Sequence, residues 1–463
     1  MIPLHARLLV AACAGLLATG CERQVPPATG APPPAVEERS VVLAEVPEAA
    51  GPPADAAPPG IGLHTASAVG SQGFVFAERG GGVGFVVEAD GKFQVIHNGR
   101  AGRPYAAVGA LVLSPDGRRH AYGALVEGRW RMVVDGKEGA PFSAVDDPVF
   151  SPDGAHLAYQ GMRGERWHLV VDGRTNAGTR THYLAHELAG DSSRLAYVED
   201  ADDADGADRG RLVITDLAFR VLAVVDAGVT SLERSPDGRW LVAVSETGGK
   251  QEVLTLPFAR PDQPRRERAY ERVTGLAFAS DRGTVAFLGE RAGRTMVVLG
   301  GREQPLPPGA AVVSPLVVRP GEDTVGALVA ADGAVRYQEF FAGGWPGAQG
   351  YVEAEGPALG PVGGLHAYAA RRGWAWHLVV NGREGPPFER IVSPRVSPDG
   401  QRIVYRARQA GRRFVVVAGL DAQTVRRYPD HDQVFPVRFT ADGKAVAYGV
   451  KDGPVLAWQV EPL

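Results

Sequence analysis

Two short stretches of the sequence gather residue types that could hold a metal ion. Residues 199–208 are rich in carboxylates of the kind Ca²⁺ prefers, but placing Gly206 at the sixth position of an EF-hand loop puts Ala201 first and Leu212 twelfth. His182 and His186 would share one face of a strand, yet no third ligand accompanies them. We therefore expect the acidic stretch to be a solvated loop and the two histidines to be packing or surface residues. We expect neither a metal site nor any other cofactor.

Signatures of catalysis are equally scarce. The sequence has no Gly-x-Ser-x-Gly nucleophile elbow, and no phosphate-binding or dinucleotide-binding glycine motif stands between a strand and a helix. A net charge of −4 without a basic stripe argues against nucleic-acid binding. These observations favour a protein that is not an enzyme, with no catalytic residue to name and no nucleic acid among its partners.

A tetrapeptide, Ser-Pro-Asp-Gly, recurs along the chain and organises it. It begins at Ser114, Ser151, Ser235 and Ser397, and units with degenerate tetrapeptides begin at Ala77, Ala189, Ala279, Arg319, Gly360 and Thr440. The residue eight places after the start is aromatic in eight of these ten units. A period near forty residues indicates one supersecondary unit repeated around a ring or along a solenoid.

Each unit has the pattern of strand, tight turn, strand, turn and strand. Proline, aspartate and glycine suit successive positions of a tight turn, and we expect the aspartates to cap their own turns rather than to converge as an acidic site: Asp116, Asp153, Asp237 and Asp399. No segment has a sustained helical period, so the sequence predicts an all-β fold.

The tetrapeptide with Ala-Tyr seven and eight places later resembles the TolB-like, WD-type β-propeller repeat, over residues 63–463. The resemblance implies about ten four-stranded blades. No Pro-rich linker interrupts the units, which favours one large ring over the alternative of two smaller propellers. The last unit has sequence for only three strands, so we expect Ser40–Glu45 or Leu63–Ala68 to pair with it and close the ring.

The resemblance also implies that the first strand of each unit lines a channel, with its early residues at one mouth. This set is polar and is either a binding site or a water-filled opening: Gln72, Asp146, Asp147, Thr230, Ser231, Thr274, Ser314, Glu355 and Ser393.

The N-terminal segment has the features of an export signal. The apolar run at 8–17 is too short to span a bilayer, and Leu17-Ala18-Thr19-Gly20-Cys21 resembles a bacterial lipobox. The resemblance implies that residues 1–20 are removed as a signal peptide and that Cys21 carries a lipid. Residues 21–62 then form the lipidated cysteine and a Pro-rich tether, with the possible closing strand at 40–45.

These features together predict a membrane-tethered binding or scaffold module of the bacterial cell envelope. It would face the periplasm, and Glu22 after the lipidated cysteine favours the outer membrane. The expected partners are the membrane, through the lipid, and an envelope protein, whereas the sequence indicates no particular small molecule. The alternatives are a lyase or hydrolase acting on envelope sugars or peptides at the channel mouth, and a purely structural surface lipoprotein.

Overall fold

The computed structural model describes residues 39–45, 74–77, 82–181, 183, 185–200, 210–278, 283–319, 322–341, 349–361, 363–440 and 442–463. All regular structure in these ranges is β, and they contain no helix long and apolar enough to cross a membrane. The compact unit Val36–Leu463 contains all of these strands. Residues 1–38 with Cys21, and also Gln72, His182, Leu63–Ala68 and residues 201–208 of the acidic stretch, lie outside the described residues.

The strands form ten antiparallel sheets, which we number as blades 1 to 10. Blades 1 to 3 comprise β2 (Phe74–Phe76), β3 (Val83–Ala89), β4 (Lys92–His97) and β5 (Arg100–Ala101); β6 (Val108–Leu113), β7 (His120–Val126), β8 (Arg129–Val134) and β9 (Lys137–Phe142); β10 (Ala144–Phe150), β11 (Leu157–Arg163), β12 (Arg166–Val171) and β13 (Arg174–Thr175). Blades 4 to 6 comprise β14 (Ala185–Leu188), β15 (Arg194–Asp200), β16 (Gly210–Asp216) and β17 (Val221–Asp226); β18 (Val229–Arg234), β19 (Trp240–Thr247), β20 (Lys250–Pro257) and β21 (Arg265–Arg266); β22 (Arg272–Phe278), β23 (Val285–Arg291), β24 (Arg294–Leu299) and β25 (Arg302–Pro305).

Blades 7 to 10 complete the set. They comprise β26 (Ala311–Val312), β27 (Val317–Val318), β28 (Val325–Ala331) and β29 (Ala334–Phe340); β30 (Glu353–Leu359), β31 (His366–Arg372), β32 (Ala375–Val380) and β33 (Arg383–Phe388); β34 (Arg390–Val396), β35 (Ile403–Gln409), β36 (Arg412–Ala418) and β37 (Thr424–Arg427); β38 (Gln433–Val434), β39 (Arg438–Phe439), β40 (Ala445–Asp452), β41 (Val455–Pro462) and β1 (Arg39–Glu45). In blades 7 and 10 the first strand is in two pieces, which pair with the same second strand.

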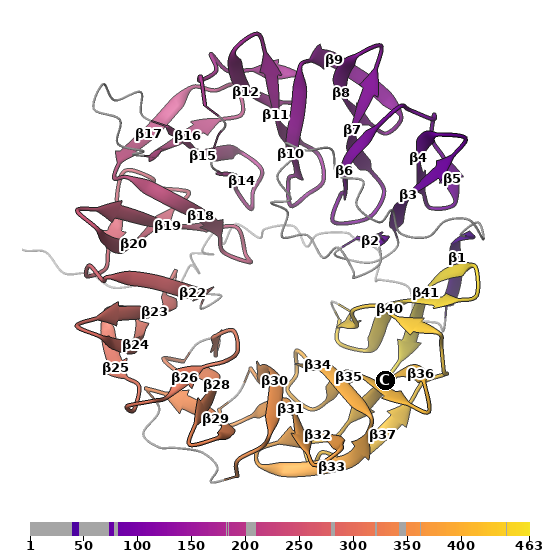
Figure 1. The fold of residues 1–463 in the computed structure, drawn as a ribbon, viewed down its shortest axis with the longest axis vertical. Coiled ribbons are helices and arrows are strands. Elements are labelled where there is room, and N and C mark those ends of the chain that lie inside the picture. The colour runs from indigo at the N-terminus through magenta and orange to yellow at the C-terminus, as the bar shows by residue number, and fades with distance from the viewer. Residues whose placement is uncertain are drawn as a thin grey trace, which may run out of the picture. The chain divides into compact units, whose positions relative to one another are not determined.

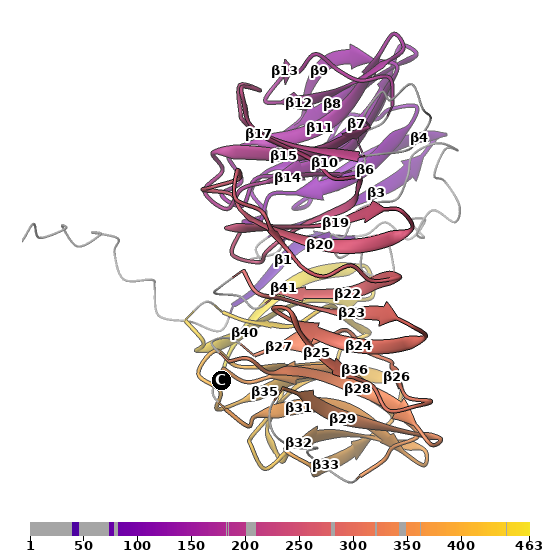
Figure 2. The same ribbon diagram turned by 90° about the vertical axis from the view of Figure 1, so that its left-hand side faces the viewer.

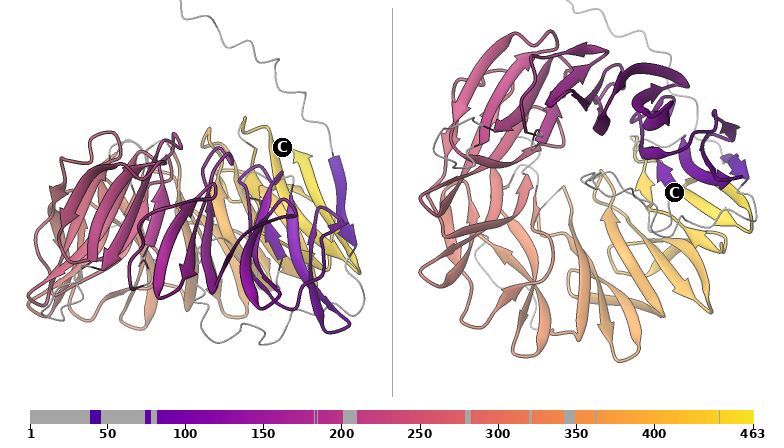
Figure 3. Two further views of the ribbon diagram at one scale, coloured as in Figure 1. Left: turned by 90° about the horizontal axis from the view of Figure 1, so that it is seen from above. Right: turned by 45° about the horizontal axis from the view of Figure 1, so that its top comes forward.

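The blades stand side by side in one ring, with the first strand of each sheet nearest the centre (Figures 1 and 3). Figure 2 shows the same ring from the side, with the strands of successive blades layered on one another. Ten clusters of buried apolar side chains occupy the ten interfaces between neighbouring blades, including the interface between blades 10 and 1. This confirms the single ring of ten blades and excludes two separate smaller propellers.

The repeat register explains why these residues form these interfaces. All ten residues that stand eight places after a tetrapeptide start are buried, with exposed fractions of 6% or less. Because this residue lies on the second strand of each blade, the aromatic ring fills the gap to a neighbouring sheet, and burial of a large apolar surface stabilises the interface. The closing interface has the same chemistry, with the Phe76 and Phe435 rings 4.6 Å apart.

The ring is closed by a strand from the N-terminal side of the chain. β1 pairs antiparallel with β41, from Arg39 opposite Val460 to Glu45 opposite Val455, and Figure 1 shows the two strands side by side. β41 in turn pairs with β40, so β1 is the outer strand of blade 10. Of the two segments considered for this role, Ser40–Glu45 therefore occupies it within the described part of the chain.

Candidate binding site on the inner strands

The Ser-Pro-Asp-Gly turns are built by side-chain hydrogen bonds within each turn. The serine hydroxyl donates to the aspartate Oδ1 at 2.5 to 2.7 Å, as in the Ser151–Asp153 pair, and the same oxygen accepts a backbone N–H two residues later. The hydroxyl hydrogen bond lowers the pKa of Asp116, Asp153 and Asp399. Asp237 has the same contacts, and its pKa is also lowered although burial opposes the shift. These four carboxylates thus serve their own turns.

Asp147 and Ser393, two of the residues expected at the channel mouth, lie at β-bulges within their strands. Their φ angles are +48° and +54°, and a proline follows each of them. The pairing of β10 with β11 and of β34 with β35 shifts register at these points. Glycines take the same place in β22 and β30, so short polar side chains here reflect a backbone conformation that aspartate, asparagine and glycine tolerate best.

The other residues of the mouth set are spread around the ring, and most are engaged by their immediate surroundings. Asp146 accepts the N–H of Asp147, and Thr230 donates to the carbonyl of Val244. Ser314 donates to the carbonyl of Pro315 and accepts the N–H of Leu328 on β28. Ser231 and Thr274 lie on β18 and β22. Glu355 accepts a 2.5 Å hydrogen bond from Arg390. Glu355 and Ser393 both act on Arg406, Ser393 through a hydrogen bond and Glu355 through its charge.

A different position on the inner strands carries the charge. The residue two places before each tetrapeptide start pairs in the same register with a small or β-branched residue of the second strand in all ten blades. We call this set the inner register. Going round from blade 1 to blade 10 it reads Val75, Val112, Val149, Glu187, Glu233, Ala277, Val317, Ala358, Arg395 and Arg438.

The inner register is therefore apolar apart from two acidic and two basic positions. In a ring of ten, blades 4 and 5 stand five places from blades 9 and 10, so the glutamates and the arginines occupy opposite sides. Figure 1 shows β14 and β18 across the ring from β34 and β40. The ring is thus electrically polarised across its inner edge, which can orient a ligand that carries both signs of charge.

The acidic side is partly neutralised by its own neighbour. Glu187 lies 3.4 Å from the Arg234 guanidinium, and burial raises the pKa of Glu187 in spite of this cation. Burial also raises the pKa of Glu233. Both carboxylates thus hold protons more tightly than usual, and Glu187 is also paired with Arg234.

The basic side has a third arginine, which is fixed in place. Arg406 on β35 donates to the carbonyl of Val434 at 3.0 Å and to the Ser393 hydroxyl at 3.3 Å. Burial lowers the pKa of Arg406 and the nearby charge of Arg395 lowers it further. Partial removal of Arg395 from water by the surrounding protein lowers its pKa although the side chain remains exposed, and the charge of Arg438 lowers it further. We call Arg395, Arg406 and Arg438 the arginine cluster.

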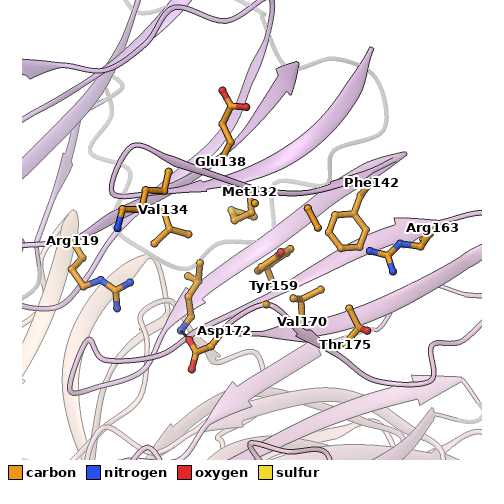
Figure 4. A pocket seen from close by; sticks show the side chains of 15 residues that line it. Arg119, Met132, Val134, Glu138, Phe142, Tyr159, Arg163, Val170, Asp172 and Thr175 are labelled. Atoms are coloured by element: carbon orange, nitrogen blue, oxygen red, sulfur yellow. Dashed lines mark hydrogen bonds between the residues drawn. The ribbon is translucent and has the colours of Figure 1, made fainter. Parts of the chain in front are cut away.

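A cavity of about 350 Å³ opens between blades 2 and 3, away from this cluster (Figure 4). Apolar side chains form its wall, including Met132, Phe142 and Tyr159. The charged groups on its rim already have partners: Glu138 pairs with Arg103 at 2.8 Å and Asp172 with His156 at 2.6 Å. Its shape and lining are those of the space between two neighbouring blades, and no set of free polar groups converges on it within the described residues.

The arginine cluster was not singled out from the sequence, because arginine is abundant throughout the chain. A signal was nevertheless present. Aligning the ten units on their tetrapeptides would have shown charged residues at a position that is otherwise valine or alanine. Among the described residues, no group of three or more His, Cys, Asp or Glu side chains is placed to hold a metal ion.

Comparisons with known proteins find distant structural likenesses and no family. No protein-family model matches the sequence, and no curated protein matches it. Solved structures with similar folds include a eukaryotic initiation factor (10% identity, TM-score 0.45, 75% of this chain and 95% of that one), a putative TolB from Agrobacterium tumefaciens (17%, 0.28, 44% and 83%) and hydrazine synthase from Kuenenia stuttgartiensis (14%, 0.28, 67% and 94%). No functional conclusion follows from likenesses at this level.

Proposed function

We propose that this protein is a non-catalytic binding module of the bacterial cell envelope, held to a membrane by a lipid on Cys21, and that its inner strands bind a partner protein. The observation that carries the proposal is the polarised inner register. Arg395 is exposed there, and no hydrogen bond or ion pair engages its guanidinium within the described residues. Charged side chains at an otherwise apolar position are more simply explained by recognition than by stability.

The tether and the ring suit this role. Arg39 enters blade 10 opposite Val460, and the adjacent residue pair Ala445–Pro462 directly follows the turn that begins at Thr440. The chain therefore enters the ring on the face that bears the tetrapeptide turns. Seventeen residues separate Cys21 from Arg39, and an extended chain of that length reaches at most about 60 Å. A lipid on Cys21 would keep the ring within that distance of the bilayer.

The binding role can be tested by crosslinking intact cells that carry the tagged protein, and comparing what is retained by the wild type, Arg395→Glu and Arg100→Glu. Arg100 is an exposed arginine on the outer strand β5, so its reversal is a matched control for net charge. We expect one protein to be retained by the wild type and the control. If none of the three proteins retained a specific partner protein, the proposal would be contradicted.

The membrane role rests on the lipobox and is tested separately. Cys21→Ser should release the protein from the membrane fraction into the soluble periplasmic fraction, because no acyl chain could then be attached. Treating the wild-type protein with mild detergent gives the control for membrane association. Continued sedimentation of the Cys21→Ser protein with membranes would show that the anchor lies elsewhere.

A further inference from the structure

Within the arginine cluster, Arg395 has no hydrogen bond or ion pair among the described residues, and the carboxylates of the neighbouring strands and turns are engaged elsewhere. Glu355 attracts Arg406, but its Oε2 is already bonded to Arg390 at 2.5 Å. The carboxylates in the turns that follow Arg395 and Arg438 are Asp399 and Asp442, and both accept hydrogen bonds from their own turns. Each of these three carboxylates therefore already has a partner other than Arg395.

The cluster is also organised before any ligand arrives. The two hydrogen bonds of Arg406 hold its guanidinium against blade 10, while its Nε is buried without a hydrogen-bond partner among the described residues. Arg395 and Arg438 stand at the same register on neighbouring blades. A guanidinium group is a planar fork that matches a carboxylate, and Arg406, already held in place, would lose little side-chain entropy on binding one.

We infer that the arginine cluster is the docking point for the carboxylate side chains of an acidic protein segment, which is the part of the partner that the inner edge of the ring recognises. This inference rests on the proposed function. Glu187 and Glu233 across the ring select for a polypeptide, because a ligand that is negative along its whole length, such as a polyphosphate or a nucleic acid, would meet like charges there. A polypeptide can present acidic residues to blades 9 and 10 and neutral or basic residues to blades 4 and 5.

The first experiment uses the full chain without its signal peptide and two fluorescent peptides of equal length, one rich in glutamate and one with glutamine at the same positions. We expect saturable binding of the glutamate peptide at low ionic strength, weakened roughly tenfold or more by Arg395→Glu and unchanged by Arg100→Glu. Because Arg395 is exposed, its variant should melt with the wild type, which the same samples can verify. Inorganic phosphate serves as the competing probe.

Three results would overturn the inference. The two peptides could bind equally well, or the wild type and Arg395→Glu could bind the glutamate peptide equally well. Inorganic phosphate, added while the ionic strength is held constant, could displace the glutamate peptide. The last result would assign the cluster to a small oxyanion. The crosslinking comparison separates this inference from the proposed function. A partner retained equally by the wild type and by Arg395→Glu would refute docking at the cluster while leaving a binding module in place.

Discussion

Two fully buried tyrosines offer a sharp test of how the blades are held together. Tyr448 lies between blades 9 and 10, with its ring 6.2 Å from that of Tyr428, and its hydroxyl is buried with no hydrogen-bond partner within the described structure. Tyr183 lies between blades 3 and 4, and its hydroxyl accepts a 2.6 Å hydrogen bond from the Asn176 amide. The two residues match in size and burial and differ in whether the hydroxyl is paired.

The expected energies follow from that difference. Removing either ring by substitution with alanine leaves a large cavity and should lower the free energy of unfolding by about 3–5 kcal/mol. Tyr448→Phe removes only an unpaired buried hydroxyl, so it should be neutral or stabilising by up to about 1 kcal/mol. Tyr183→Phe strands the Asn176 amide, which is half-buried, and should cost about 1 kcal/mol.

The assay is urea denaturation of residues 22–463, followed by circular dichroism, on the wild type and the four variants. The midpoints should rank Tyr448→Phe at or above the wild type, then Tyr183→Phe, then both alanine variants. If Tyr448→Phe fell as far as Tyr183→Phe, the Tyr448 hydroxyl would have to be bonded, and the reasoning on that interface would be refuted. Unchanged midpoints for both alanine variants would refute the packing of the ring itself.

Two further predictions concern the closing strand and the histidines. Deleting residues 22–46 removes β1 and should lower the melting temperature, whereas deleting residues 22–38 keeps β1 and should not; equal melting of the two truncated proteins would show that β1 adds no stability. Burial lowers the pKa of both His97 and His120, whose rings lie 4.4 Å apart, so the unfolded chain takes up protons first as the pH falls. Stability should therefore be complete above the ordinary histidine pKa of about 6.5 and decline below it, and His120→Gln should reduce that decline in pH-dependent melting curves.

The repeat predicted most of the fold because its signal is local. Each tetrapeptide start that the structure describes coincides with the turn between the first and second strands of a blade, and the residue eight places later, usually aromatic, is buried in an interface. Both features depend on residues close together in the sequence, so a single unit specifies them. The number of units then determines the number of blades, because each apolar blade face needs a neighbour.

The charged site was harder to predict because the role of each charged residue depends on which residues of other units surround it. Arg319 shows the problem. It stands where other units have serine, and its own unit offers no reason to treat it as more than a degenerate repeat, yet it is 1% exposed and bonds Glu339 at 2.8 Å. Arg395, two places before its own turn, is by contrast exposed and without an ion pair among the described residues. Two arginines near equivalent turns thus differ completely in role, and only the surrounding blades decide which is structural.

The pairing of β1 with β41 also means that an incomplete chain differs from a complete one in the apolar surface that it exposes. β1 is synthesised before every other strand of the ring and β41 after them, so blade 10 cannot form until the whole ring sequence is available. A chain interrupted before blade 10 would leave two apolar faces uncovered, one at Phe74 and Phe76 and the other on the last blade made. Such surfaces attract chaperones and proteases and promote aggregation. Closure therefore distinguishes complete from incomplete chains, because only a chain with all ten blades can bury the apolar faces of both its first and its last blade.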